Sequence, residues 1–349
     1  MKICIIGPVH TTSYYGGVAL FDEELAIGFA KCNCDVVIAT YQKNAEEKQL
    51  CDRVWIRRFN KYSFSKYLSH NEPDIIIASL GYAALLPKKK LQAAKIYFLH
   101  GFFNERFYGR IKAALAVLYQ RYLIKRYDYV FANSYFTRMI NREFFGIESD
   151  KVLHLGVSEE VFEKASKAEL REKERGSVFF AGRLVEVKGT RALVEAAKTL
   201  ADRGIKCSFQ IAGDGPDYEW MQSEIREYGL QMQLLGRVSQ TDIADYYQKS
   251  EVFVSLCPTE SFGITYIEAL MNGCKIVCPK TGGQIEYLLN MTDRVAFVAE
   301  DSATEIADGI QRLFEQEGIY EIPYEEKNGF RYAYVAQEVL NFVSNQRNK

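Results

Sequence analysis

The sequence lacks any hydrophobic run long enough to cross a membrane. Apolar residues make up 48% of its 349 residues, yet no stretch approaches the roughly 20 consecutive apolar residues that a spanning helix needs. The first seven residues run directly into a strand pattern, without the ordered regions of a signal peptide. We therefore expect a cytoplasmic protein, which could also attach peripherally to the inner face of a membrane.

Motifs for metal ions, dinucleotides and nucleic acids are also missing. The eight cysteines include no C-x-x-C pair, and the chain has no Asp-x-Asp. No G-x-G-x-x-G follows the first strand pattern, and no acidic residue ends the second. We expect reduced, mostly buried thiols, no bound metal and no resident cofactor. No nucleic-acid-binding motif accompanies the basic residues, so nucleic acid is not an expected partner.

Charge is divided unequally along the chain although the net charge is only −1. Residues 1–150 hold 21 Lys and Arg against 14 Asp and Glu, whereas residues 151–349 hold 23 against 31. The two halves therefore carry about +7 and −8, which predicts different partners for each.

Short apolar runs alternate with segments of helix length over the whole chain. They are near-continuous and rich in Val, Ile and Phe, as strands covered by helices on both faces are. The sequence therefore predicts an α/β fold with two Rossmann-like, doubly wound domains. We place the domains at 1–160 and 161–326, followed by a C-terminal helix at 327–349. The runs are 3–6, 36–39, 54–56, 75–78, 96–99, 130–132, 152–155, 178–181, 209–212, 232–235, 252–256, 275–278 and 295–298.

Two glycine-containing loops follow predicted strands, where open α/β sheets bind ligands. Gly16-Gly17 opens a helix, and its backbone N–H groups could approach an anion; the alternative is a tight turn. Arg183 and Lys188 follow the strand at 178–181. Two cations converging there suit a diphosphate, and the alternative is a pair of solvated surface charges.

The strongest signal is the segment 252–270. A buried strand ends, Glu260 precedes a helix that begins near Gly263, and Glu268 follows inside that helix. Glu260 could accept hydrogen bonds from ligand hydroxyls while the first-turn N–H groups of the helix face a phosphate. The alternative is that Glu260 is merely a carboxylate near the N-terminus of a helix, where the helix dipole favours a negative charge. Glu268 requires a partner, because burying an unpaired carboxylate is costly.

These residues resemble glycosyltransferase family 4, whose members have the GT-B architecture of two domains facing a cleft. The resemblance covers nearly the whole chain and rests on an ordered set of motifs: Gly16-Gly17, His100-Gly101, Gly182-Arg183-x4-Lys188-Gly189, Gly213-Asp214-Gly215-Pro216, Leu235-Gly236-Arg237-Val238, Glu260-x7-Glu268 and Gly282-Gly283-x-x-Glu286. One departure is Ser261, where many relatives carry glycine.

The resemblance implies a role for each matched residue. Arg183 and Lys188 would hold the diphosphate of a nucleotide-sugar donor, and Glu260 would bind its sugar hydroxyls. Glu268 would hold the ribose. His100, which also ends an apolar strand and could simply cap backbone groups, would face the sugar near the reacting carbon. The donor-binding set would further comprise Gly16, Gly17, Gly213, Arg237, Val238, Ser261, Phe262, Gly263, Ile264 and Thr265.

The implied activity is transfer of a hexose-type sugar, from a UDP-sugar in preference, to a saccharide or lipid-linked saccharide. The resemblance implies retention of configuration, and surface polysaccharide or glycolipid synthesis would be the setting. Arg183 and Lys188 would take the place of a metal ion. Two alternatives stay open: a nucleotide-sugar epimerase on the same scaffold, and a non-catalytic nucleotide-sugar-binding subunit of a transferase complex. The cations and aromatics of Arg106–Arg126 suggest an anionic membrane surface for the first domain.

Overall fold

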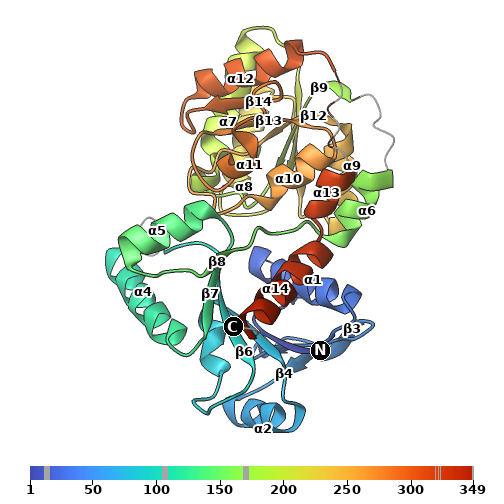
Figure 1. The fold of residues 1–349 in the computed structure, drawn as a ribbon. Helices are drawn as coiled ribbons and strands as arrows, with labels where there is room; N and C mark the ends of the chain where they lie inside the picture. The colour runs from blue at the N-terminus through green and yellow to red at the C-terminus, as the bar shows by residue number, and fades with distance from the viewer. Residues whose placement is uncertain are drawn as a thin grey trace. The chain divides into compact units, whose positions relative to one another are not determined.

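The computed structural model describes residues 1–11, 16–103, 109–167, 173–318, 320, 322 and 324–347, without the side chains of 240, 241, 324 and 325. The chain forms two compact units (Figure 1). The first joins Met1–Gly156 to Gly329–Lys349, and the second is Val157–Asn328. The sequence had placed the divisions near 160 and 326.

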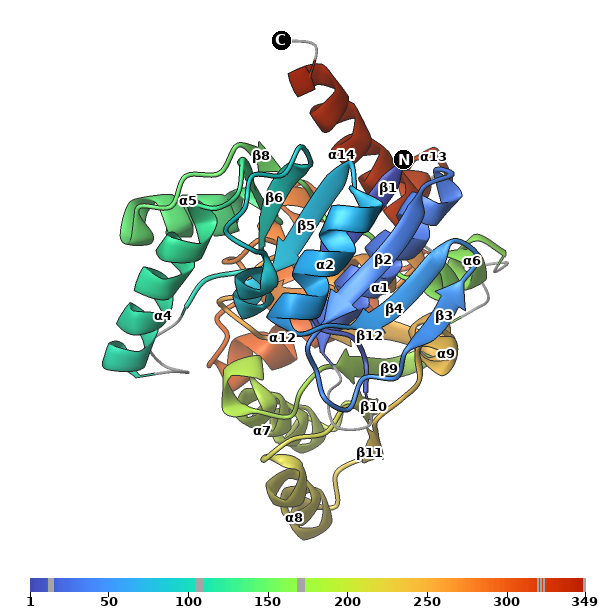
Figure 2. The same cartoon turned by 90° about the horizontal axis from the view of Figure 1, so that it is seen from below.

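The first domain contains one sheet of strand order β3-β4-β2-β1-β5-β6-β7-β8. All neighbouring pairs are parallel except β3 with β4, which is antiparallel. Figure 2 shows β1, β2 and β4 to one side of β5 and β6. The strands are β1 (Lys2–Ile6), β2 (Asp35–Thr40), β3 (Lys48–Cys51), β4 (Val54–Arg58), β5 (Ile75–Ser79), β6 (Ala94–Leu99), β7 (Tyr129–Ala132) and β8 (Lys151–Val152).

Helices cover both faces of this sheet. The C-terminal helix α14 packs on α1, because Gly28 leaves room for the chain at Tyr332: a Cβ on Gly28 would lie 2.3 Å from the Tyr332 carbonyl oxygen. The helices are α1 (Gly17–Lys31), α2 (Lys61–Asn71), the 3-10 helix η1 (Leu80–Leu85), α4 (Arg110–Ile124), α5 (Tyr135–Phe145) and α14 (Tyr332–Arg347).

The sequence patterns located all strands of this sheet but one. Strand β3 was not predicted because its four residues, Lys48–Cys51, are exposed or half-buried and form the antiparallel edge of the sheet. An edge strand needs no apolar run.

The second domain contains a six-stranded parallel sheet of order β11-β10-β9-β12-β13-β14. One core lies between this sheet and α7, α8 and α12, and a second lies on the side of α9 and α10. The strands are β9 (Glu174–Ala181), β10 (Ser208–Ala212), β11 (Met232–Gly236), β12 (Ser250–Val254), β13 (Lys275–Pro279) and β14 (Val295–Val298). The helices are α6 (Glu159–Lys167), η2 (Glu186–Lys188), α7 (Thr190–Asp202), α8 (Tyr218–Tyr228), α9 (Gln240–Lys249), α10 (Ile264–Met271), α11 (Ile285–Leu288) and α12 (Ala303–Glu315), while α13 (Tyr324–Gly329) reaches the boundary between the units.

Each sheet has one point where the chain reverses the direction in which it adds strands. In the first sheet this point lies between β1 and β5, and in the second it lies between β9 and β12. Ligands of open α/β sheets bind at the carboxyl ends of the strands at such points. The loops after these four strands therefore define where each domain can hold a ligand.

Candidate functional site

Lys188 and Glu260 form an ion pair at the switch point of the second sheet. Lys188 ends the loop after β9, and Glu260 lies in the loop after β12. The Lys188 Nζ lies 2.6 Å from the Glu260 Oε2, although 72 residues separate the two in sequence. The structure thus brings together two residues that the sequence assigned to one site.

The electrostatics of the pair favour a permanently charged lysine. Burial alone would lower the pKa of Lys188, but the carboxylate of Glu260 and the nearby Cys257 outweigh burial and hold that pKa above its usual value. Arg183, in the same loop, is exposed and has no ion-pair partner among the described residues. The loop after β9 therefore offers one fixed cation and one cation that can turn toward an anionic ligand.

The loop that carries Glu260 is built around residues that must be glycine. Gly263 has φ +86°, and a Cβ there would lie 2.5 Å from the Tyr266 ring. A Cβ on Gly283 would lie 2.2 Å from the Ser261 carbonyl oxygen, and the Gly283 N–H donates to the Glu260 carbonyl oxygen at 2.8 Å. The loops after β12 and β13 are thus packed backbone against backbone, which fixes Glu260.

Tyr287 closes this arrangement and was missed by the sequence analysis. Its hydroxyl is 2.8 Å from the Phe262 carbonyl oxygen and 2.7 Å from that of Gly263. The Phe262 ring is buried against the Tyr287 ring, so Phe262 offers a ligand its backbone rather than its side chain. Ser261, Ile264 and Thr265 are half-buried around the start of α10, whose first N–H groups have no helical acceptor.

The loops after β9, β10 and β11 are tied together in the same way. A Cβ on Gly213 would lie 1.8 Å from the Gly182 carbonyl oxygen, and the Gly213 N–H donates to the Gly236 carbonyl oxygen at 2.7 Å. Arg237 is exposed and pairs with Asp214 at 3.3 Å. Val238 is half-buried beside the core on the α9 side. The three predicted donor-binding residues in these loops, Gly213, Arg237 and Val238, therefore lie on loops that contact one another at one edge of the sheet.

Glu268 is buried inside α10 and has the partner that its burial demands. It is 3% exposed, and the Tyr247 hydroxyl donates to its Oε2 at 3.0 Å. Burial raises the pKa of Glu268 to about 7, against the smaller lowering by the Tyr247 hydrogen bond. Its expected contact with a ribose stays a prediction.

The remaining site residues lie in the first domain. Gly16 precedes α1 in an extended conformation, and a Cβ on Gly17 would meet nothing within 4 Å. Residues 12–15 of that loop lie outside the described residues. His100 follows β6, and its Nε2 is 2.9 Å from the Ser79 Oγ. Burial lowers the pKa of His100 to about 3, so its imidazole is neutral at physiological pH.

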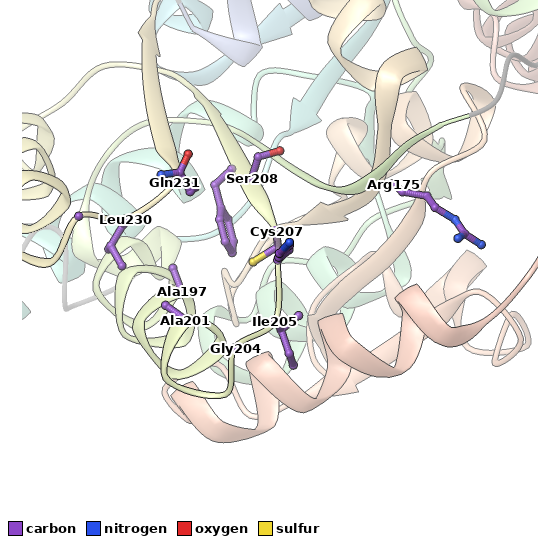
Figure 3. Close-up of a pocket in the computed structure, with 12 residues that line it drawn as sticks. Arg175, Ala197, Ala201, Gly204, Ile205, Cys207, Ser208, Leu230 and Gln231 are labelled. Carbon is purple, nitrogen blue, oxygen red and sulfur yellow. The ribbon is translucent and has the colours of Figure 1, made fainter.

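The second domain also contains a cavity of about 550 Å³, and Figure 3 shows residues that line it. Its lining includes Ile205, Cys207 and Ser208 before or at the start of β10, and Leu230 and Gln231 before β11. These are the amino ends of the strands, opposite to the ends that carry Lys188 and Glu260. Burial raises the pKa of Cys207 to about 11, which favours the protonated thiol near neutral pH. The cavity is therefore not assigned to the site.

Within the described residues, the thiols form no disulfide and the acidic side chains form no metal cluster. All eight cysteines are free. In the part of the chain that the structure describes, no group of three or more His, Cys, Asp and Glu side chains is placed to hold a metal ion. No helix among the described residues is long and apolar enough to span a bilayer.

Two family models match consecutive parts of the chain. The model described as Glycosyltransferase Family 4 matches residues 15–160, and the model described as Glycosyl transferases group 1 matches residues 161–329. The chain is 34% identical over 109 residues to the 2-deoxystreptamine N-acetyl-D-glucosaminyltransferase of Niallia circulans, which is 31% of this chain and 28% of that protein. It is 30% identical over 158 residues to the α-D-kanosaminyltransferase of Streptomyces kanamyceticus, covering 44% and 41% of the two chains. The matches thus span less than half the length of these relatives.

Solved structures share the fold over the full length. Sucrose-phosphate synthase of Thermosynechococcus elongatus superposes with a TM-score of 0.78 at 14% identity, covering 99% of both chains. Anabaena HepE, solved with UDP and glucose, gives a TM-score of 0.74 at 17% identity, again over 99% of both chains. The two family models, which together match residues 15–329, show that the chain belongs to the glycosyltransferases of the family 4 type, and the solved structures share its GT-B fold.

Proposed function

We propose that this chain transfers a hexose-type sugar from a nucleoside-diphosphate sugar, with a UDP-sugar preferred, to a saccharide or lipid-linked saccharide. The observation that carries the proposal is the Lys188–Glu260 pair at the switch point of the second sheet, beside the exposed Arg183. Structures of the same fold have been solved with UDP-glucose and with UDP and GlcNAc, which supports a nucleotide-sugar donor. Relatives named as glucosyl- and N-acetylglucosaminyltransferases favour a hexose.

The reaction cleaves the bond between the sugar and the β-phosphate of the donor, and the leaving diphosphate gains negative charge. Lys188 stays charged throughout and Arg183 can reorient, so the two cations stabilise that charge without a metal ion. Glu260 accepts hydrogen bonds from sugar hydroxyls and orients the sugar. His100 faces the sugar in this proposal. The acceptor hydroxyl oxygen bonds to the anomeric carbon with retention, as in family 4, and its proton passes to the leaving phosphate on the same face.

The acceptor side of the proposal rests on the exposed face of α4. Ile111, Leu115, Leu118 and Tyr122 recur at spacings of four, three and four residues, and each is at least half exposed. Exposed Lys112, Arg121 and Lys125 flank this stripe. An apolar stripe with cations on either side suits the headgroup region of an anionic bilayer. We propose that this stripe, the α4 stripe, presents the enzyme to a lipid-linked acceptor at the inner face of a membrane, in surface polysaccharide or glycolipid synthesis. Arg106, Phe107 and Tyr108 of the predicted basic segment lie outside the described residues.

One turnover experiment separates this function from its two alternatives. The purified chain is incubated with UDP-sugars and candidate acceptors, and both released UDP and sugar products are analysed. Acceptor-dependent UDP release with a new glycoside supports the transferase. An altered free sugar without acceptor indicates an epimerase, and binding without any turnover indicates a non-catalytic subunit. Repeating the assay in excess chelator tests metal independence: unchanged turnover is expected, whereas loss that magnesium or manganese restores would contradict it.

A further inference from the structure

Three side chains at the switch point of the first sheet form a continuous chain of hydrogen bonds. The Ser79 Oγ, at the end of β5, is 2.8 Å from the Asp22 Oδ1 in α1 and 2.9 Å from the His100 Nε2 after β6. Asp22 and Ser79 belong to none of the family motifs, and no sequence pattern gives either residue a role. Through Ser79, Asp22 can influence the protonation of the His100 imidazole.

The Asp22 carboxyl group is buried in a space beside Gly7 that any larger residue would fill. It is fully buried, and a Cβ on Gly7 would lie 1.8 Å from its Oδ2, so the missing side chain of Gly7 provides the space. The Asp22 Oδ2 is buried without a hydrogen-bond partner among the described residues. A buried, half-satisfied carboxylate is costly, whereas a neutral carboxylic acid is tolerated. Burial, with a smaller contribution from Glu23, raises the pKa of Asp22 well above its usual value despite the hydrogen bond to Ser79.

The protonation state of Asp22 fixes the direction of every hydrogen bond in the chain. With an ionised Asp22 the Ser79 hydroxyl donates to the Asp22 Oδ1. The Asp22 Oδ2 has no partner among the described residues, so a neutral Asp22 places its proton on Oδ1 and donates it to the Ser79 Oγ. The single hydroxyl hydrogen of Ser79 then points at the His100 Nε2. That nitrogen must accept, so the ring proton lies on Nδ1. An ionised Asp22 would reverse both bonds and place the proton on Nε2 instead. No described residue bonds the His100 Nδ1.

The surroundings hold the imidazole in one orientation. The Phe21 and Phe98 rings pack against it with centroids at 4.7 and 4.9 Å, and the Asn133 side chain donates to the His100 carbonyl oxygen at 3.0 Å. Glu23, the neighbour of Asp22 in α1, pairs with His10, whose Nδ1 lies 2.9 Å from the Glu23 Oε2. Packing therefore fixes the orientation of the ring, and the hydrogen bonds from Asp22 through Ser79 decide which ring nitrogen of His100 carries the proton.

We propose that Asp22 and Ser79 are positioning residues that keep His100 neutral with its proton on Nδ1, so that the half-buried imidazole presents an N–H donor to an oxygen of the bound donor. The tautomer assignment stands on its own, and its catalytic consequence rests on the proposed transferase function. An N–H donor stabilises an oxygen that gains negative charge as the glycosyl bond breaks, whereas the other tautomer would present a lone pair and repel it.

The tautomer is measured directly in the ligand-free protein. The chain has four histidines, so nitrogen-15 labelling of histidine gives four imidazole spin systems, and His100→Asn identifies the one that belongs to His100. We expect the His100 proton on Nδ1 near neutral pH. We expect Asp22→Asn, whose amide still donates to Ser79, to keep this tautomer, and Asp22→Leu and Ser79→Ala to lose it. A proton on Nε2, an imidazolium, or an unchanged tautomer in Ser79→Ala would overturn the proposal.

Kinetics test the consequence separately. We expect Ser79→Ala and Asp22→Leu to lower kcat about tenfold with the donor KM little changed, the size of one hydrogen bond, and Asp22→Asn to restore most of kcat. In a His100→Ala background, Ser79→Ala should have no further effect. The buried Ser149→Ala, whose hydroxyl has no partner in the described structure, is the matched control. Additive losses in the double variant would overturn the positioning role. A parent chain without turnover would instead contradict the proposed function and leave the tautomer measurement valid.

Discussion

The Lys188 ammonium lies 2.6 Å from the Glu260 carboxylate at the point where the second sheet reverses its strand order. Each side chain has a separate role in the proposed reaction, yet without a ligand the two charges are paired with each other. Binding of a diphosphate and a sugar would therefore replace one charge-assisted contact with two.

This pairing predicts a large kinetic effect of Lys188→Ala. Loss of one donor to the leaving oxygen slows transfer by about 10² to 10³, and Arg183→Ala should lower the rate by a similar factor. Steady-state kinetics with a UDP-sugar measure both. Lys198→Ala is the matched control, because Lys198 also forms a lysine–carboxylate pair at 2.6 Å, with Glu224, but on the helices rather than the loops. Near-parental turnover in both loop variants would remove the diphosphate assignment.

Alanine substitutions at Gly263 and Gly204 distinguish the effect of displacing the loop that carries Glu260 from the effect of backbone strain alone. Both have positive φ, +86° and +71°, but a Cβ at Gly263 would strike the Tyr266 ring whereas one at Gly204 would meet nothing within 4 Å. Gly204→Ala should cost about 1 kcal/mol of stability and leave transfer unchanged. Gly263→Ala should cost more and weaken donor binding, because the loop carrying Glu260 must shift. Thermal unfolding and donor titration measure both effects, and equal donor affinity in the two variants would contradict the loop argument.

Glu268 makes the stability of the ligand-free protein depend on pH. Its pKa is about 7 in the folded chain against an ordinary 4.5, so the folded state binds the extra proton between these values. Stability from this group is therefore present below about pH 4.5 and is lost as pH rises to about 7, by about 3 kcal/mol. Glu268→Gln keeps an acceptor for Tyr247 without the charge. It should match the parent near about pH 5 and unfold at a higher temperature near about pH 8; a constant difference across this range would contradict the prediction.

The α4 stripe predicts salt-sensitive membrane binding. The parent should sediment with vesicles that contain anionic lipid at low salt and be released at high salt. Leu115→Gln with Leu118→Gln should weaken this binding, while Leu289→Gln, an exposed leucine of the second domain, should not. Equal recovery with neutral and anionic vesicles would contradict the membrane proposal and leave the transferase proposal intact.

Local patterns predicted the strands because most of them are buried, such as β5 and β13, in which every residue is buried. They could not predict β3, whose edge position needs no apolar residues. The motifs indicated Lys188 and Glu260, but their direct pairing depends on β9 and β12 being neighbours, which no local pattern specifies. Asp22 could not be identified for the same reason: a carboxylate in an amphipathic helix indicates an exposed face, whereas here Gly7, directly after β1, leaves the space in which Asp22 is buried.

The most direct test of the account is donor binding by the ligand-free chain. A thermal-shift panel of nucleotide-sugars and free nucleotides measures it, since a ligand at about 100 times its Kd stabilises the folded protein by about 2.7 kcal/mol. We predict that at least one UDP-sugar raises the melting temperature of the parent and of Lys198→Ala, and that Lys188→Ala with Arg183→Ala loses this shift. If no nucleotide-sugar shifts the parent, or if the double variant responds as the parent does, the donor site proposed at Lys188 and Glu260 is wrong.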